Sequence, residues 1–267
     1  MSYECPICRE ALVLDKRQWR CPQQHCFDIA KEGYVNLLPV NKKHSRDPGD
    51  NQQMMAARRT FLQAGFYQPL SDRINVLAAG LGLQAPSTLD VGCGEGYYSQ
   101  RLQQAVNGSL QGMDISKTAV RYAAKRYPQL RFCVASAYDM PFASGSFDLM
   151  LKIFAPGAAE ELQRVCRNGG YYISVTAGPM HHYALKQIIY QQPREHPLSS
   201  GQLSGFSLVH QERLQWQLQL PAGEISSSFL QMTPYAWKFT PEQKQQLQQQ
   251  GVNCELDFSI EVFQRQL

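Results

Sequence analysis

Apolar residues in the middle of the chain occur in short runs, separated by longer segments with helical spacing. The segment 117–127 has this helical spacing and stops at Pro128, and helices are also expected at 53–64 and 70–83. Strands are predicted for the short apolar runs at 87–91, 110–113, 131–134, 147–154 and 171–176. Because strands alternate with helices, the pattern indicates an α/β fold with a parallel sheet built from βαβ units.

The two ends of the chain depart from this alternation. Near the C-terminus, Thr240 and Gln243 form a predicted capping box around Pro241, which indicates the start of a helix. After Gly251, apolar and polar residues alternate as far as Val262, which predicts a terminal strand with one buried face. The N-terminal segment is turn-rich and contains four of the eight cysteines.

The composition is typical of a folded protein. Of the 267 residues, 43% are hydrophobic and 10% are aromatic, which is enough to bury a substantial core and excludes intrinsic disorder for most of the chain. The sequence lacks an apolar run of about 18 residues, as a membrane span needs, and charged residues and cysteines stand where a secretory signal would need an apolar run. We therefore expect a cytoplasmic protein. The net charge of +4 permits a nucleic-acid partner without requiring one.

A Cys/His cluster near the N-terminus has the spacing of a zinc site. Two residues separate Cys5 from Cys8, and after twelve more residues Cys21 and His25 follow with three residues between them. Zn²⁺ binds sulfur and imidazole nitrogen in a tetrahedron, and a structural site fills all four positions. Cys26 is an alternative to His25 as the fourth ligand. A segment this short cannot form a core of its own, so we expect the metal to be structural.

Three regions are predicted along the chain. Residues 1–36 form a zinc-binding module, 37–70 form a connector with a basic helix, and 71–267 form the α/β domain. The basic residues of the connector are Lys42, Lys43, Arg46, Arg58 and Arg59. In the helix at 117–127, Lys117, Arg121 and Lys125 are spaced by four and share one face, which suits contacts with phosphate groups.

A glycine-rich loop follows the predicted strand at 87–91. The run DVGCGEGY, residues 90–97, ends that strand and opens a helix, and its glycines let a ligand approach the backbone closely. Tyr97 stands where a dinucleotide fingerprint needs its third glycine, which disfavours NAD and FAD. Asp114 lies 22 residues after Gly92, at the end of the next strand, where a carboxylate can accept both hydroxyl hydrogens of a ribose.

The strand, the glycine loop and the second acid together resemble the class I methyltransferases that use S-adenosylmethionine, which implies a Rossmann-like sheet. The cofactor-binding residues that this resemblance implies are Asp90, Gly92, Gly94 and Glu95 at the methionine end and Asp114 at the ribose. Many members place an acidic residue after the third strand to bind adenine, whereas this chain has Ser136 between two alanines. The adenine contact is therefore open.

A closer resemblance extends over essentially the full length. It is carried by FDIAKEGYVNLLP at 27–39, SRDPGD at 45–50, segments 57–59 and 67–70, IFAP at 153–156 and QMTP at 231–234. These motifs resemble the RlmA family, whose members methylate N1 of a guanine in a hairpin loop of 23S ribosomal RNA. The resemblance implies zinc ligation by Cys5, Cys8, Cys21 and His25, cofactor contacts from Tyr67 and His181, and a homodimer that encloses the RNA.

The expected reaction needs alignment and a proton acceptor. The methyl group of a sulfonium is already activated, so the enzyme has to align the guanine N1 with it and exclude water. The N1 proton must leave, and our hypothesis for its acceptor is Asp47 or Asp50, although the same DPGD run is also typical of a plain turn. A loop guanine unstacks easily, and Tyr67, Phe154 or Trp237 could stack on it.

Two other functions fit parts of the sequence. The first is methylation of a small molecule, against which the zinc module and the basic connector argue. The second is a non-catalytic zinc-containing RNA-binding protein, against which the intact loop from Asp90 to Gly96 and the second acid argue. We therefore expect an S-adenosylmethionine-dependent 23S rRNA (guanine-N1)-methyltransferase. Its catalytic residue, and the guanine that it modifies, are not assigned by the sequence.

Overall fold

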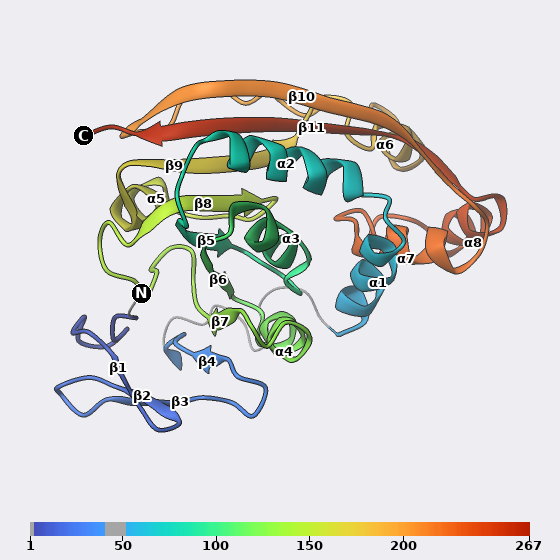
Figure 1. Cartoon of the computed structure of the whole chain (residues 1–267). Coiled ribbons are helices and arrows are strands. Elements are labelled where there is room, and N and C mark those ends of the chain that lie inside the picture. The colour runs from blue at the N-terminus through green and yellow to red at the C-terminus, as the bar shows by residue number, and fades with distance from the viewer. Residues whose placement is uncertain (1–2, 41–51) are drawn as a thin grey trace.

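The structure, a computed structural model, describes residues 3–40 and 52–267. An eight-stranded mixed sheet runs through it in the order β10-β11-β9-β8-β5-β6-β7-β4 (Figure 1). The strands from β9 to β4 are parallel, whereas β11 and β10 extend one edge in antiparallel fashion. The strands are β4 (Val35–Asn36), β5 (Ser87–Val91), β6 (Ser109–Asp114), β7 (Arg131–Val134), β8 (Phe147–Ile153), β9 (Cys166–Ala177), β10 (Phe206–Leu220) and β11 (Val252–Arg265).

The predicted α/β fold is confirmed. The predicted strands at 87–91 and 131–134 coincide with β5 and β7, and the one at 171–176 lies inside β9. These strands were predictable because a parallel sheet is buried on both faces, so that its strands are short and almost continuously apolar. Helix α4 (Lys117–Arg126) begins where expected, and its N-cap Ser116 accepts a hydrogen bond from the backbone N–H of Ala119 at 3.2 Å.

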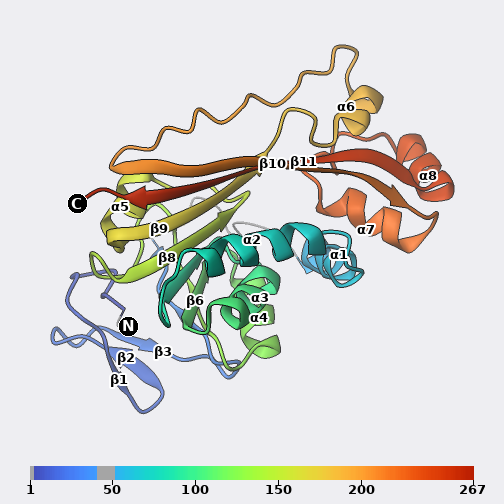
Figure 2. The same cartoon turned by 45° about the horizontal axis from the view of Figure 1, so that its top comes forward.

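Two apolar cores cover the two faces of the sheet. On one face, α2 (Gln68–Gly80), α3 (Tyr97–Val106) and α4 share a core with Leu149 and Leu151 of β8. Met150 belongs to the second core, because successive side chains of a strand point to opposite faces. That core also contains residues of α5 (Ala159–Val165) and of the N-terminal module. Figure 2 shows α2, α3 and α4 together on their side of the sheet.

The C-terminal third forms the antiparallel edge. Helices α6 (Tyr183–Ile189), α7 (Glu224–Met232) and α8 (Pro241–Gln250) lie beside the long ribbon of β10 and β11 (Figure 2). The predicted capping box of α8 is confirmed in both its hydrogen bonds. The predicted terminal strand is confirmed as β11, and burial alternates as expected from Val252 to Leu256. From there on the prediction of one buried face is wrong, because Asp257 and Ser259 are buried as well as Phe258. Arg213 of β10 donates to the Asp257 carboxylate at 3.2 and 2.5 Å, so the polar face is paired instead of solvated.

The N-terminal region forms a small sheet of its own. Strands β1 (Val13–Asp15), β2 (Gln18–Arg20) and β3 (Cys26–Asp28) are antiparallel, whereas β4 pairs with β7 of the large sheet. The rings of Tyr3 and Phe142 lie 5.5 Å apart, and the backbone N–H of Glu4 donates to the carbonyl of Pro141 at 2.9 Å. These contacts hold the small sheet against the large domain. Within residues 3–40 and 52–267, no helix is both long and apolar enough to cross a membrane.

Candidate functional site

A cleft of about 450 Å³ opens at the carboxyl ends of β5, β6, β7 and β8. Ligands of open α/β sheets bind in this crevice, and the volume is in the range of small-molecule sites. One wall comes from α1 (Gln52–Gln63) and α7, which pack side by side. The residues that line the cleft from the sheet loops include Asp90, Gly92, Gly94, Glu95, Asp114, Ser116, Ser136, Tyr138, Phe154 and Ala155.

The glycine loop lies against the turn that follows β8. A Cβ atom on Gly92 would lie 2.3 Å from the Cβ of Ala155, so a side chain at this position does not fit. Its φ of +76° is also in the region that favours glycine. The backbone N–H groups of Gly92 and Cys93 both donate to the carbonyl of Met113, at 2.8 and 2.9 Å, and thereby tie the loop to β6.

Two carboxylates flank this loop. Asp114 accepts hydrogen bonds from the backbone N–H of Gly94 at 2.9 Å and of Ser116 at 2.8 Å, which orient its carboxylate at the cleft. Asp90 is 2% exposed and accepts a hydrogen bond from the Ser99 hydroxyl at 2.5 Å. Burial raises the pKa of Asp90 to about 7; the Ser99 hydrogen bond opposes this shift, and the charge of Asp114 adds to it.

Glu95 also borders the cleft, but one of its oxygens is held by an arginine of α1. Arg59 Nε donates to Glu95 Oε2 at 3.0 Å, and Arg126 Nη1 lies 3.7 Å from the same oxygen. Burial raises the pKa of Glu95, while the arginines oppose the shift. The second oxygen, Oε1, is buried and has no hydrogen-bond partner among the described residues. A buried acceptor in this state is suited to a donor from a ligand.

Tyr67 and His181 belong to one aromatic cluster around Phe258, but His181 does not line the cleft. Tyr67 lines the cleft and is 4% exposed, and its hydroxyl lies 3.3 Å from Nε2 of His182. His181 is 5% exposed and lies behind Phe154, with 5.4 Å between the ring centroids. Burial lowers the pKa of His181 to about 3, so its ring is neutral at physiological pH.

Several cleft residues were not found from the sequence. Tyr138 lines the cleft beside Ser136, in the place where the adenine contact was open, and Met232 of α7 forms part of the opposite wall. Arg58 lines the cleft too, so this connector residue was predicted as basic but not as part of the site. For Met232 the available signal was the QMTP motif at 231–234, although this motif is far from the glycine loop in sequence.

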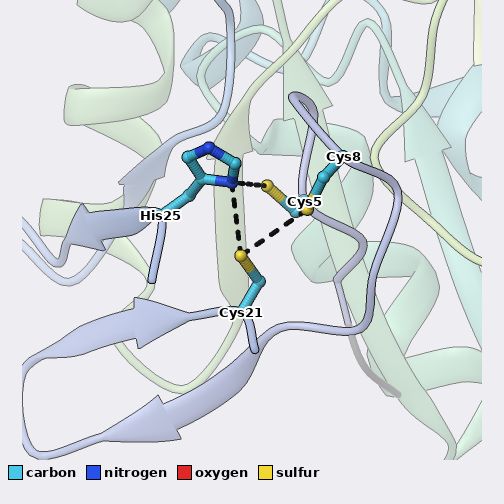
Figure 3. A group of neighbouring side chains, drawn as sticks. All are labelled: Cys5, Cys8, Cys21 and His25. Carbon is cyan, nitrogen blue, oxygen red and sulfur yellow. Dashed lines mark hydrogen bonds between the residues drawn. The ribbon is translucent and has the colours of Figure 1, made fainter. Parts of the chain in front are cut away.

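The predicted zinc ligands meet at one point of the N-terminal module (Figure 3). The ligand atoms of Cys5, Cys8, Cys21 and His25 all lie within 4.8 Å of one another. His25 Nδ1 lies 3.6 Å from Cys5 Sγ and 3.4 Å from Cys21 Sγ, and the sulfurs of Cys8 and Cys21 lie 3.6 Å apart. A tetrahedral zinc ion with bonds of about 2.0–2.3 Å separates its ligands by roughly this distance. The donor set and the spacing therefore fit zinc.

Cys26 is outside this cluster. Its side chain is exposed, and its Sγ donates to the backbone carbonyl of Gln24. The alternative of Cys26 as the fourth ligand is thus not the arrangement found, since His25 faces the sulfurs (Figure 3).

The predicted basic surface is present in part. Lys117, Arg121 and Lys125 are all exposed on α4, as the spacing indicated. The candidate bases Asp47 and Asp50, and the basic residues Lys42, Lys43 and Arg46, lie outside the described residues.

Known proteins share both the fold and the sequence pattern. Residues 3–46 match a family profile described as "RlmA, N-terminal", a zinc ribbon, and residues 88–170 match one described as "Methyltransferase domain". A solved structure of a "putative methyltransferase" from Bacillus halodurans C-125 superposes with a TM-score of 0.50 at 16% identity. It covers 72% of this chain and 99% of its own, and it supports the fold alone.

Relatives identified by sequence are more specific. The chain is 32% identical to the 23S rRNA (guanine(748)-N(1))-methyltransferase of Streptomyces fradiae, over 90% of this chain and 87% of the relative. It is 28% identical to the "Putative 23S rRNA (guanine-N(1)-)-methyltransferase YxjB" of Bacillus subtilis, over 97% and 95% of the two chains. The zinc ribbon, the methyltransferase sheet and this similarity over most of the length lead to one assignment. The chain belongs to the RlmA family of 23S rRNA (guanine-N1)-methyltransferases.

Proposed function

We propose that the protein transfers a methyl group from S-adenosylmethionine to N1 of a guanine in a hairpin loop of 23S rRNA. The observation that carries this proposal is the cleft at the carboxyl ends of the parallel strands, with its glycine loop and two carboxylates, in a chain that resembles rRNA methyltransferases over most of its length. The methyltransferase fold uses S-adenosylmethionine, and the ribbon holds a structural zinc ion.

The cleft offers suitable partners for each part of the cofactor. We assign Asp90, Gly92, Gly94 and Glu95 to the methionine end and Asp114 to the ribose. The unpartnered Oε1 of Glu95 and the nearby Asp90 can accept hydrogen bonds from an ammonium group. Tyr67, which lines the cleft, is assigned as a further contact. The contact from His181 stays a prediction from the resemblance, since His181 packs against Phe154 and does not itself line the cleft. Ser136 and Tyr138 line the cleft where the adenine contact is open.

The protein's own contribution to the reaction is placement. When bound, the cofactor supplies an activated methyl group on a sulfonium. The residues around the cleft must then hold the guanine N1 in line with that group and exclude water. A proton acceptor near N1 is needed, and Asp47 or Asp50 remains our hypothesis for it.

The other parts of the molecule fit an RNA substrate. The zinc module provides a second rigid surface next to the methyltransferase domain, and the exposed lysines and arginine of α4 can bind phosphates. We also propose that the protein acts as a homodimer in the cytoplasm. The division of the chain at residues 36 and 70 stays a prediction.

Methyl transfer to RNA tests the proposed function. The protein is incubated with labelled S-adenosylmethionine and 23S rRNA that lacks the modification, and the product is read by primer extension. Because N1-methylguanine blocks base pairing, we expect label in the RNA and a stop at one loop guanine. Label without a stop would show that the methylated atom does not lie on the base-pairing edge. An absence of label despite cofactor binding would favour a small-molecule acceptor.

A further inference from the structure

Phe154 has an unusual backbone conformation at the cleft. It follows β8 with a φ of +52°, a region that bulky side chains rarely adopt. Its ring is also 46% exposed and lines the cleft, although a large apolar side chain normally gains by burial. Strain of this kind persists only where the surroundings enforce it, and it occurs most often at functional sites.

Neighbouring residues fix this conformation. The backbone N–H of Phe154 donates to the carbonyl of Val175 on β9 at 3.1 Å, and the ammonium of Lys152 donates to the carbonyl of Ala155 at 3.0 Å. Ala155 in turn packs so closely on Gly92 that a Cβ atom there would lie 2.3 Å away. Phe154 is therefore fixed in the turn directly before Ala155, the residue that contacts the glycine loop.

Aromatic rings support Phe154 from behind. The ring centroid of His181 lies 5.4 Å from that of Phe154, and the centroid of Phe258 lies 5.8 Å from it. His181 is itself stacked on His182 at 3.8 Å, and its Nδ1 accepts a hydrogen bond from the backbone N–H of Asp257 at 3.2 Å. The ring thus has a packed, uncharged support and an exposed portion at the cleft.

We propose that Phe154 is the platform on which the acceptor guanine stacks during methyl transfer. This inference rests on the proposed function and names the base-binding part of the same site. A base that is modified must leave its own stack, and an aromatic side chain replaces the stacking that it loses. The platform stands next to Gly92, on the side of the cleft assigned to the methionine end, where the reactive methyl group belongs.

The other exposed or cleft-lining aromatics are less suited to this role. Tyr67 is 4% exposed, and its hydroxyl faces His182. Tyr138 is exposed at the cleft, but it follows β7, on the side of Asp114 and the ribose. Trp237 is 75% exposed and lines a separate hollow with residues of α1, α7 and α8.

Substitutions at Phe154 can distinguish the effect of the aromatic ring from the effect of the strained backbone. Asparagine tolerates a positive φ and has no aromatic face, so Phe154→Asn keeps the turn and removes the platform. Phe154→Tyr keeps both the ring and the strain, whereas Phe154→Leu keeps the strain and an apolar side chain without the π face. Trp237→Leu removes a more exposed ring away from the cleft. Each variant is tested as the full-length, zinc-loaded protein.

Steady-state methylation of unmodified 23S rRNA and calorimetric titration of S-adenosylmethionine give the two readouts. We expect Phe154→Asn and Phe154→Leu to lower kcat/KM for the RNA by about 10- to 100-fold, the range for losing one base–aromatic stack, with an unchanged cofactor dissociation constant. Phe154→Tyr, which keeps the ring, should lose clearly less than Phe154→Leu, and Trp237→Leu should retain the rate of the unchanged protein. If Phe154→Asn does not fold, the comparison of the Leu and Tyr variants decides.

The two proposals fail in different ways. If the unchanged protein binds the cofactor but transfers no label to 23S rRNA, the proposed function is wrong. If the unchanged protein labels the RNA, and Phe154→Leu labels it equally well, the platform is wrong and the function stands. A loss in Trp237→Leu without a loss at Phe154 would also overturn the platform.

Discussion

Arg59 of α1 donates a hydrogen bond from Nε to the carboxylate of Glu95 at 3.0 Å, and thereby joins the connector helix to the glycine loop. The Glu95 side chain is 1% exposed, whereas that of Arg59 is 34% exposed. The guanidinium also lies over the ring of Tyr122, 4.5 Å from its centroid. A buried carboxylate needs such a partner, so the pair links the position of α1 to that of the loop.

We predict that Arg59→Ala destabilises the protein by roughly 1–3 kcal/mol, because it removes the hydrogen bond to a buried carboxylate and leaves it with more distant charges such as Arg126, at 3.7 Å. Urea unfolding measures this loss. Arg121→Ala is the matched control, since Arg121 also lies over the Tyr122 ring but is absent from the Glu95 pair. Adding Glu95→Gln to Arg59→Ala should restore part of the stability. Equal stability of the single and double variants would contradict the buried-charge explanation.

We predict that Asp90 makes stability fall as the pH rises. Its pKa in the folded protein is about 7, above its usual value of 3.8, so between these values the folded chain holds a proton that the unfolded chain has lost. The free energy of unfolding therefore decreases with pH in this window, by at most about 1.4 kcal/mol per pH unit. Asp90→Asn removes this contribution and leaves those of other groups.

The measurement for Asp90 is the difference in unfolding free energy between the original protein and Asp90→Asn, taken from about pH 5 to pH 7. We expect the Asp90→Asn variant to gain stability relative to the original protein as the pH rises. Ser99→Ala is the second variant, because losing the Ser99 hydroxyl removes a hydrogen bond that favours the ionised form. Ser99→Ala should therefore raise the pKa of Asp90 further, so that the range in which stability falls with pH extends to higher pH. A difference between the original protein and Asp90→Asn that does not change with pH would show that Asp90 is ionised throughout.

How far the sequence predicts the structure depends on how local each signal is. The strand at 87–91, the loop after it and Asp114 could be predicted because a buried parallel strand and a glycine turn are encoded in a few adjacent residues. The zinc cluster could be predicted because ligand types and spacing are enough to define it. By contrast, the Arg59–Glu95 pair joins residues 36 positions apart, and a local pattern carries no signal for it.

The ribbon of β10 and β11 shows a second limit. The sequence carries a strand signal at β10, since Leu214, Trp216, Leu218 and Leu220 alternate with glutamines. The polar face of β11 was assigned to solvent because the sequence does not reveal that Arg213 of the neighbouring strand pairs with Asp257. The strain at Phe154 is likewise imposed by distant groups, Val175 among them, and has no signature in the IFAP motif.

We predict that Cys8→Ser lowers the zinc content and RNA methylation but leaves cofactor binding unchanged. The ribbon depends on the metal because its own core is small, whereas the described residues that line the cleft begin at Met55 of α1. Metal analysis, cofactor titration and methylation of 23S rRNA are measured together. Cys26→Ser is the matched control, since this neighbouring thiol is exposed and faces Gln24 instead of the cluster. Full methylation by zinc-free protein would rule out a role of the ribbon in RNA recognition.

We predict that Gly92→Ala abolishes cofactor binding through a steric clash that a second substitution can relieve. The added Cβ would lie 2.3 Å from the Cβ of Ala155, so the glycine loop or the turn after β8 must move. Gly169→Ala is the matched control: Gly169 has the same φ of +76°, but a Cβ there meets nothing within 4 Å. It should lose only the backbone cost of about 1 kcal/mol and bind the cofactor normally.

The double variant Gly92→Ala with Ala155→Gly tests this explanation, because it removes the atom that the new Cβ meets and leaves the positive φ in place. Calorimetric titration of S-adenosylmethionine should show restored binding in the double variant and none in the single one. Binding that stays absent in the double variant would mean that the ligand, and not Ala155, needs the space at Gly92. Restored binding would instead establish that close packing of the loop on the turn after β8 sets the shape of the cleft.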